Sequence, residues 1–342
     1  KNLFQQQRFR IPTNKLPPIL KTCIFVYSGE IQAQKKDTPV DENKVVRFYL
    51  SEKHRKSVVE GKQNFISKFA AVLETENFSV DFCDNSLSEQ VQSMTRKGHA
   101  VFYMKEPTNR NGVTIRPNYF YPFWNIETTA NRWQWSTAED KFDARCIPKD
   151  EATSFANFWR QKQFGDKAKN ISHQGFVYVP LQGRLLSQRS FQSCDPITMI
   201  KQVLEFDKTR EVVATLHPKE TYSIEELNAL SDLEAHHSRL RVSKGNMEIW
   251  LQGCDYVATQ NSAAAFSGYF FKKPVVLFGR VNFHHIAANV HELGPEAAIN
   301  QVAHLNPDFD AYIWWFLRHK SIHASKPDAE DRIRNAIRRV GW

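Results

Sequence analysis

The chain has 342 residues, a length that favours two domains of ordinary size over one. Its hydrophobic content of 41%, with 13 Gly and 15 Pro, is typical of a globular protein and excludes a disordered or fibrous chain. The formal net charge of +9 favours anionic partners such as nucleotides, acidic glycans, nucleic acid or an anionic membrane surface. The basic residues form only short clusters, which argues against a dedicated nucleic-acid-binding protein.

No apolar run approaches the roughly 20 residues that cross a bilayer, so no membrane span is predicted. The five cysteines show no CxxC spacing, which argues against a disulfide framework or a zinc site. We therefore expect a reducing, cytoplasmic compartment, with peripheral contact at the inner membrane left open. The chain starts at Lys1 without a secretory leader, so export is not indicated.

The first half of the chain alternates strand and helix patterns after an N-terminal arm, residues 1–20. Runs of β-branched and aromatic residues predict strands, and apolar residues at helical spacing predict helices. The strands are expected at 22–28, 45–50, 78–84 and 99–106, and the helices at 57–75 and 87–97. Residues 107–150 interrupt this rhythm with a polar and aromatic segment, before a helix at 150–165 and a linker at 165–175.

The second half repeats the alternation more regularly. Strands are expected at 175–182, in "EVVATLHP" (211–218), in "RLRVSKG", in "DYVATQ" and in "PVVLFG", with helices between them. Asp195 and Pro196 are suited to start the helix that ends at residue 206, and Ser223 and Glu226 have capping-box spacing. The final segment, 324–342, predicts an amphipathic helix that either packs on the protein or binds an anionic surface.

Alternating strands and helices predict parallel sheets with crossover helices, which is the Rossmann-like α/β class. We place an N-terminal domain at 21–170 and a C-terminal domain at 171–323, facing each other across a cleft. In open α/β sheets, ligands bind at the carboxyl ends of the strands.

His217 lies at such a strand end, where Pro218 stops the strand and the imidazole could donate a hydrogen bond to a phosphate. A structural loop histidine explains the residue equally well. In "TQNSAAAF", a later strand ends before Ser262, where a helix of small residues could offer its free N–H groups to an anion. A simple helix cap at Asn261 or Ser262 is the alternative, but two such strand ends in one sheet favour a phosphate site.

The order strand, "HP", helix, strand, helix, "D.V.T.NS...F.G....KPVVLFGR" resembles the C-terminal domain of GT-B glycosyltransferases. The closest resemblance is to bacterial capsule-polysaccharide proteins related to the Kdo transferases, over residues 175–290. This resemblance implies that His217, Ser262 and Asn261 hold the donor phosphate, and that Gln182 is the strand-end glutamine of the donor site. The retaining Kdo transferases carry an aspartate soon after that strand, whereas this chain has no carboxylate until Asp195.

Further donor-site candidates lie in the loop 183–192, where Arg184 and Arg189 could clamp a phosphate or a sugar carboxylate. Either arginine could instead be a solvated loop residue. His284 follows the strand "PVVLFG" and could approach the donor. Its neighbour His285 should point away from it, since adjacent side chains do not share a face, so no metal site is expected.

The aromatic segment offers candidate acceptor-binding residues that could stack on sugars or pair with acidic groups. They are Arg116, Trp124, Arg132 and Trp133. Burial in a core is the alternative for the aromatic residues. Glu30, directly after the first predicted strand, is the first candidate for a catalytic base, acting with His217. Glu106, Glu127 and Glu139 are further candidates, and each could be a surface carboxylate instead.

Together these patterns predict a metal-independent GT-B glycosyltransferase without a cofactor. The resemblance implies a nucleotide-sugar donor, including a CMP-linked acidic sugar such as Kdo, and a surface-polysaccharide or lipid-linked acceptor. A nucleic-acid partner is not expected. The alternatives are a noncatalytic nucleotide- or glycan-binding module, or a nucleotide-sugar epimerase or polyol-phosphate transferase of the same fold.

Overall fold

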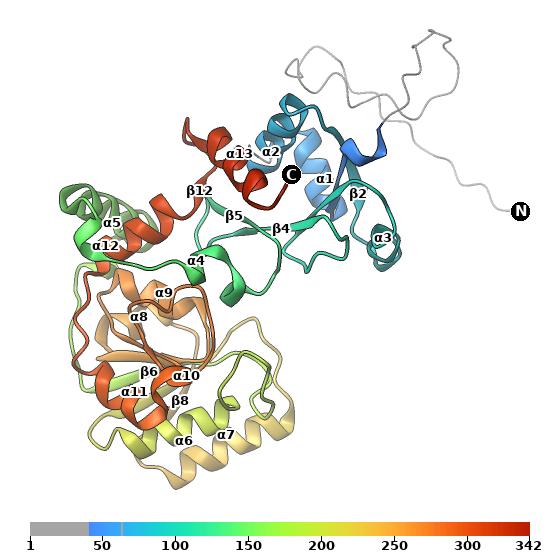
Figure 1. Cartoon of the computed structure of the whole chain (residues 1–342). Coiled ribbons are helices and arrows are strands. Elements are labelled where there is room, and N and C mark those ends of the chain that lie inside the picture. The colour runs from blue at the N-terminus through green and yellow to red at the C-terminus, as the bar shows by residue number, and fades with distance from the viewer. Residues whose placement is uncertain (1–40, 63) are drawn as a thin grey trace, which may run out of the picture. The chain divides into compact units, whose positions relative to one another are not determined.

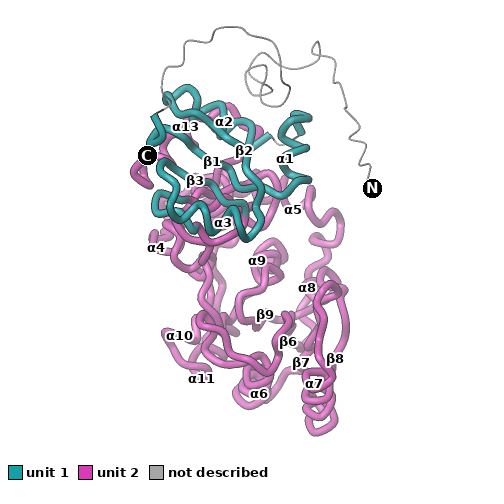
Figure 2. The backbone as a smooth tube through the Cα atoms, turned by 90° about the vertical axis from the view of Figure 1, so that its right-hand side faces the viewer, with its two compact units in different colours: residues 1–103, 108–112 teal, residues 104–107, 113–342 magenta. Residues whose placement is uncertain are grey.

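The computed structural model describes residues 41–62 and 64–342 of the chain. They belong to two compact units: the first contains residues up to 103 together with 108–112, and the second contains 104–107 and 113–342 (Figure 2). The strand expected at 22–28 and the candidate base Glu30 lie outside the described residues. The domain boundary expected near residue 170 falls within the second unit.

The first unit is a small parallel α/β sheet in the order β3–β1–β2. Its elements are β1 (Val45–Leu50), α1 (Glu52–Val59), α2 (Asn64–Thr75), β2 (Ser79–Asp84), α3 (Leu87–Ser93) and β3 (His99–Tyr103). Phe48 of β1 packs on Phe69 of α2 with ring centroids 5.3 Å apart, and both side chains are fully buried. The single helix expected at 57–75 is wrong, because Gly61 has a φ of +69° that ends α1 and separates it from α2.

The second unit begins with strands in the aromatic segment, where the sequence predicted no regular element. The antiparallel strands β4 (Gly112–Pro117) and β5 (Phe123–Glu127) pair with each other, and β12 (Ile322–His323) pairs with β5. The same unit contains four helices that are labelled in Figure 1: α4 (Ser136–Glu139), α5 (Lys149–Phe164), α12 (Phe309–Ile313) and α13 (Ala329–Arg339). Arg160 of α5 links two of these helices, because it donates to Asp310 of α12 at 2.7 Å.

The larger part of the second unit is a parallel sheet in the order β11–β10–β9–β6–β7–β8. Its strands are β6 (Phe176–Pro180), β7 (Glu211–Leu216), β8 (Leu240–Lys244), β9 (Tyr256–Thr259), β10 (Val275–Leu277) and β11 (Ala288–Asn289). Its helices are α6 (Pro196–Phe206), α7 (Ile224–His236), α8 (Met247–Gly253), α9 (Ala263–Phe270), α10 (Val290–Leu293) and α11 (Pro295–Val302). In Figure 1, α6 and α7 lie on one side of the sheet and α8 and α9 on the other.

This arrangement buries both faces of the central strands. Tyr178 of β6 belongs to the core shared with α9, whereas the neighbouring Val177 and Val179 belong to the core shared with α6 and α7. All five residues of β6 are buried, as expected for a central parallel strand covered by helices on both faces. The α/β fold class is therefore confirmed.

The helix starts expected in this half are also confirmed. The Asp195 side chain accepts a hydrogen bond from the N–H of Thr198, with Pro196 in the first turn of α6. Ser223 and Glu226 form a complete capping box at α7. Across the part of the chain that the structure describes, no helix is long and apolar enough to span a bilayer.

Candidate functional site

Three neighbouring strands of the parallel sheet bring candidate residues to one edge. The order β9–β6–β7 and the pairing of Pro180 with Thr215 align the carboxyl ends of these strands. Gln182 follows β6, His217 follows β7 and Asn261 follows β9. Adjacent strands lie about 4.8 Å apart, so residues after β7 and β9 flank those after β6 at a separation of roughly 10 Å.

The exposed His217 has a defined tautomer. Its Nδ1 accepts the backbone N–H of Lys219 at 3.2 Å, while its own backbone N–H donates to the Tyr222 hydroxyl at 2.8 Å. Because Nδ1 accepts, the neutral ring carries its proton on Nε2. The imidazole can therefore donate a hydrogen bond to an anion at the strand edge.

The start of α9 lies at the same edge. Ser262 caps this helix, since its hydroxyl oxygen accepts the N–H of Ala264 at 3.3 Å. Ala265 is fully buried, whereas Ala263 is exposed. The first turn of the helix is therefore accessible at Ala263, where the side chain is small. A helix start with accessible N–H groups favours negative charge.

A cavity of about 420 Å³ in the second unit connects this edge with the aromatic segment. Gln182, Asn261 and Ala263 line it from the sheet. Arg116, Arg132 and Trp133 line it from the aromatic segment, together with Tyr119 and Ala130. The structure thus brings two residues predicted to bind a donor together with three predicted to bind an acceptor.

The two arginines are the main charged groups of the cavity. Arg116 Nη1 donates to the carbonyl of Ala130 at 2.9 Å, and Arg132 Nη2 donates to the carbonyl of Pro117 at 3.2 Å. The Arg132 guanidinium also stacks over the ring of Tyr119, 4.1 Å from its centroid. Arg116 Nε and Arg132 Nη1 are buried without a hydrogen-bond partner in the structure.

This arginine pair has no neutralising carboxylate within ion-pair distance among residues 41–62 and 64–342. Burial, reinforced by the nearby charge of Arg132, lowers the pKa of Arg116 from its usual value. A guanidinium stays protonated at any ordinary pH, so burial beside a second cation is unfavourable for this charge. An anionic ligand would offset this cost.

Six of the other predicted residues do not line this cavity, and Trp124 and His284 are two of them. His217 and Ser262 lie at the strand edge beside it, and Arg184 and Arg189 lie in the loop after β6. Arg184 is exposed and has a φ of +66°. Arg189 stacks over Phe191, 4.9 Å from the ring centroid, and burial followed by the charge of Arg184 lowers its pKa.

Trp124 does not fit an acceptor-binding role. It lies on β5, where it pairs with Ile322 of β12, and only 3% of its surface is exposed. The alternative, burial in a core, describes its position. Burial removes the indole face that stacking on a sugar would require.

The candidate carboxylates have different environments. Glu106 Oε2 accepts the N–H of Ala130 at 2.7 Å, which places this exposed glutamate next to a residue of the cavity wall. Glu127 is buried and forms an ion pair with Arg339 at 3.2 Å, and burial raises its pKa. Glu139 is exposed on α4. Of these three candidates for the catalytic base, Glu106 is therefore the one that lies beside the cavity.

His284 and His285 occupy a turn in which their rings stack, with centroids 4.3 Å apart. The expectation that the two rings point apart is wrong, because the chain here is neither a helix nor a strand. His284 Nδ1 donates to the Val281 carbonyl at 2.9 Å, and His285 lies between the Tyr312 hydroxyl and the Asp140 carbonyl. Within the described ranges, no three His, Cys, Asp or Glu side chains could together hold a metal ion.

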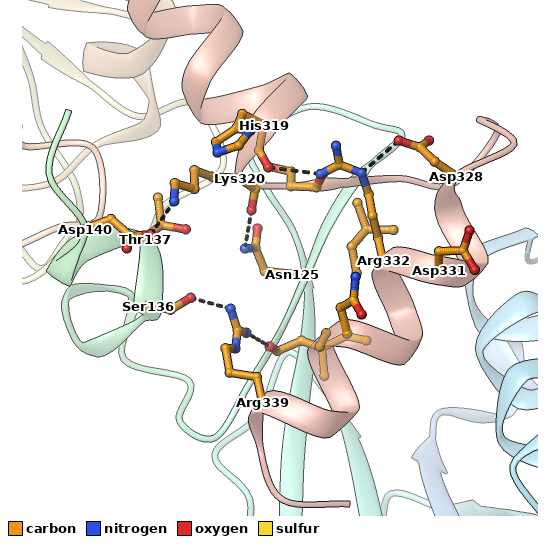
Figure 3. Close-up of a pocket in the computed structure, with 15 residues that line it drawn as sticks. Asn125, Ser136, Thr137, Asp140, His319, Lys320, Asp328, Asp331, Arg332 and Arg339 are labelled. Carbon is orange, nitrogen blue, oxygen red and sulfur yellow. Dashed lines mark hydrogen bonds and ion pairs between the residues drawn. The ribbon is translucent and has the colours of Figure 1, made fainter. Parts of the chain in front are cut away.

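A second cavity of similar size, about 410 Å³, has a different character (Figure 3). It lies among β5, β12, α4 and α13, and Lys320 pairs with Asp140 at 2.8 Å and Arg332 with Asp328 at 2.9 Å. Arg339 pairs with Glu127, which lies outside the lining. The Arg339–Glu127 pair joins α13 to β5, whereas Arg332 and Asp328 lie one turn apart at the start of α13. Because carboxylates already neutralise these cations, this cavity should bind an anion more weakly than the cavity of Arg116 and Arg132.

The sequence placed Tyr119 among the aromatic residues that could stack on a sugar, but its contact with Asn282, which fixes the wall of the candidate site, was missed. The Tyr119 hydroxyl donates to the Asn282 side chain at 2.8 Å, and its ring carries the Arg132 guanidinium. Burial raises the pKa of this tyrosine, so it remains a neutral donor. Since 163 residues separate the two partners, the sequence held no local signal for their contact.

No protein-family model and no curated protein sequence matches the chain. Among solved structures, it is similar to KpsC of Thermosulfurimonas dismutans, a beta Kdo 2,7 transferase, with a TM-score of 0.52 and 13% identity over 86% of this chain and 99% of that chain. The KpsC beta Kdo 2,4 transferase of the same organism gives a TM-score of 0.46 and 12% identity, over 86% of this chain and 98% of that chain. The first likeness extends over nearly all of that transferase, so the chain has the Rossmann-like GT-B fold that its sequence predicted.

Proposed function

We propose that the protein is a glycosyltransferase that moves a sugar from a nucleotide donor to a polysaccharide or lipid-linked acceptor. The observation that carries this proposal is the single cavity in which Gln182, Asn261 and Ala263 face Arg116 and Arg132. One side of it is the carboxyl edge of a parallel α/β sheet, where such folds bind nucleotides. The other side is a cationic, aromatic wall suited to an acidic saccharide.

The donor phosphate would lie against the sheet edge. The Nε2–H of His217 and the start of α9 at Ser262 would each donate to phosphate oxygens, with Asn261 beside them. Arg184 and Arg189, in the loop after β6, would complete this electrostatic support. Protein cations and N–H groups would then stabilise the departing phosphate, which is the task of a metal ion in many other transferases.

In a direct displacement, the acceptor hydroxyl gives its proton to a carboxylate and its oxygen bonds to the anomeric carbon. The bond from that carbon to the phosphate oxygen breaks, and the electron pair leaves on the phosphate. Glu30 is our first candidate for this carboxylate, because it directly follows the first strand predicted from the sequence. Among the candidates that the structure describes, we favour Glu106, because it lies beside the cavity and its carboxylate accepts hydrogen bonds from Ala130 and Thr129.

The donor sugar that we propose is acidic, with a CMP-linked sugar such as Kdo as the leading example. The sequence suggested Arg116 and Arg132 for the acceptor, but they share a cavity with the donor-edge residues Gln182 and Asn261, so we assign them to the donor sugar. Two guanidinium groups without a carboxylate of their own suit a sugar carboxylate. A neutral sugar would leave their charge uncompensated.

Thermal unfolding with CMP, UDP, GDP and ADP tests the proposal. We expect one nucleotide to raise the melting temperature of the wild-type protein, and His217→Ala to reduce that increase while His304→Ala, an exposed histidine in another turn, keeps it. If no nucleotide stabilises the protein, the transferase proposal loses its basis.

Donor hydrolysis then separates an enzyme from a binding module. Water can replace the acceptor, so the matching nucleotide sugar should be hydrolysed slowly by the wild-type protein. Glu30→Gln and Glu106→Gln are compared, and loss of hydrolysis with intact nucleotide binding identifies the base. Binding without any turnover, with or without glycan acceptors, would favour the noncatalytic module.

A further inference from the structure

A third cavity, of about 320 Å³, adjoins the candidate site within the second unit. The two cavities share Trp133 and Val281 as a common wall. The rest of its lining comes from the segments after β10 and β11, including Arg280, His284 and Glu292. A ligand held beside Trp133 in the candidate site could therefore continue into this space.

The shared wall is anchored. The Trp133 ring packs on Phe191 with centroids 5.3 Å apart. The carbonyl of Phe191 accepts two hydrogen bonds, from the N–H of Arg280 at 2.8 Å and from the Nε2–H of His291 at 3.1 Å. Trp133 is only partly buried, so one portion of a fixed indole remains accessible. A fixed, partly exposed aromatic ring is suited to stack on the apolar face of a ligand ring.

Hydrogen-bond donors and acceptors both surround this aromatic wall. Because His284 Nδ1 donates to the Val281 carbonyl, the neutral ring leaves Nε2 as a hydrogen-bond acceptor. Glu292 adds a second acceptor, and Arg280 adds donors, with no ion-pair partner recorded for it in the described part of the chain. An indole face bordered by separate donors and acceptors matches the alternating hydroxyl groups and C–H faces of a sugar.

The charge of this cavity also differs from that of the candidate site. It combines one guanidinium with one carboxylate, whereas the candidate site has two guanidinium groups and no carboxylate in its lining. An anionic group should therefore prefer the candidate site, and an uncharged polyhydroxylated ring should prefer the space beyond Trp133.

The geometry points to a second saccharide subsite in this third cavity, which holds the next sugar unit of the acceptor glycan and makes the protein select acceptors by length. This inference rests on the proposed transferase function, because it assigns the reacting sugar to the candidate site. The stacking and hydrogen bonds at Trp133 and His284 would contribute only when the acceptor has at least two sugar units.

A printed array of bacterial surface glycans, with mono- to tetrasaccharide members of each series, tests the subsite with the labelled full-length protein. We expect binding at least tenfold tighter to a disaccharide or longer member than to the monosaccharide of the same series. Trp133→Ala and His284→Ala should lower the affinity for the longer glycans to that for the monosaccharide, while Trp133→Phe should keep most of the preference for longer glycans. Phe158→Ala and His304→Ala are the controls, because both residues are exposed elsewhere.

Thermal shifts with nucleotides complete the experiment, on Arg280→Gln and Glu292→Gln, because these two residues line the third cavity and not the candidate site. Unchanged nucleotide stabilisation in these two variants, with a weaker length preference on the array, supports the subsite. Weaker nucleotide stabilisation would assign the cavity to the donor base and overturn the inference. Equal binding of short and long glycans, or binding of none, would also overturn it, while nucleotide stabilisation of the wild-type protein would leave the proposed function standing.

Discussion

At the scale of single residues, the candidate site is defined by two arginines that have no carboxylate partner. Within residues 41–62 and 64–342, most buried or half-buried arginines have a carboxylate partner, as Arg160 has in Asp310 and Arg210 has in Asp255. Arg116 and Arg132 instead bond to backbone carbonyls. Burying a cation in this way costs stability, which an anionic ligand can restore.

Arg132→Gln should therefore weaken binding of the stabilising nucleotide sugar about 10- to 100-fold, since a hydrogen bond to a charged group contributes about 1.5–3 kcal/mol. The measurement is titration calorimetry. Arg110→Gln, which removes an exposed arginine in the first unit, is the matched control. Equal affinity in Arg132→Gln and wild-type protein would show that the arginine pair does not touch the ligand.

His285 should make stability depend on pH. Burial, followed by the neighbouring His284, lowers the pKa of His285 to about 4. The unfolded chain then binds a proton near the ordinary pKa of about 6.5, while the folded protein does not, so stability falls as pH decreases from about 6.5 towards 4. The loss is at most about 3 kcal/mol, and no further loss is expected below the folded pKa.

Urea unfolding at pH 7 and pH 5 measures this effect. His285→Gln keeps an N–H for the Asp140 carbonyl but does not titrate, so its stability should change less between the two pH values than that of the wild-type protein. His304→Gln, at an exposed position, should behave like the wild-type protein. The same pH dependence in all three proteins would assign it to another group.

At the scale of elements, the sequence predicted the parallel sheet well because each of its strands is a short apolar run bounded by a helix or a turn. That pattern was enough to place Gln182, His217 and Asn261 at strand ends, and the register then aligns those ends. The same reasoning failed for β4 and β5. All five residues of β5 are buried, and its second neighbour, β12, lies about 200 residues later in the chain.

The cavity depends on those missed strands. Arg116 lies on β4, and Arg132 begins a 3₁₀ turn after β5. The residue types suggested binding, but only the antiparallel pairing of β4 and β5 fixes the segment that carries them. No local sequence pattern reveals which strands pair here. The sequence could therefore identify these residues as candidates for binding the acceptor, but it could not predict where they lie in the fold.

Gly279, just after β10, is required for the close approach of two site-bearing segments. A Cβ atom at this position would lie 2.8 Å from the carbonyl oxygen of Gln260, the residue before Asn261. Gly279→Ala should therefore cost about 1–3 kcal/mol and shift the loop that carries Asn261 and Ser262.

Thermal unfolding and nucleotide titration of Gly279→Ala check this expectation. Gly183→Ala is the control for the melting temperature, because the only close contact of a Cβ there would be the end of the flexible Glu220 side chain. A melting temperature for Gly279→Ala equal to that of the wild-type protein would mean that the two segments can separate without cost.

At the scale of the whole molecule, the C-terminal residues complete the second unit. Helix α13 contacts β5 and β12, and its Ala329, Ile333 and Ile337 are buried. Arg339 adds an ion pair with Glu127 of β5, and Arg332 pairs with Asp328 within the first turn of the helix (Figure 3). Of the two interpretations of residues 324–342, packing on the protein agrees with this placement. The amphipathic pattern alone could not choose, because a basic polar face suits solvent and an anionic surface equally well.

A chain that ends at Ser325 keeps β12 and loses α13, and it distinguishes these interpretations. If α13 is an integral part of the unit, its removal exposes the apolar surface under Ile333 and Ile337, and the melting temperature should fall steeply. In the full-length chain, Ile333→Ala alone should cost about 2–5 kcal/mol, as for other fully buried isoleucines. Neither change should alter binding to phosphatidylglycerol vesicles. A shortened chain with the wild-type melting temperature and reduced vesicle binding would instead establish a detachable, membrane-binding helix.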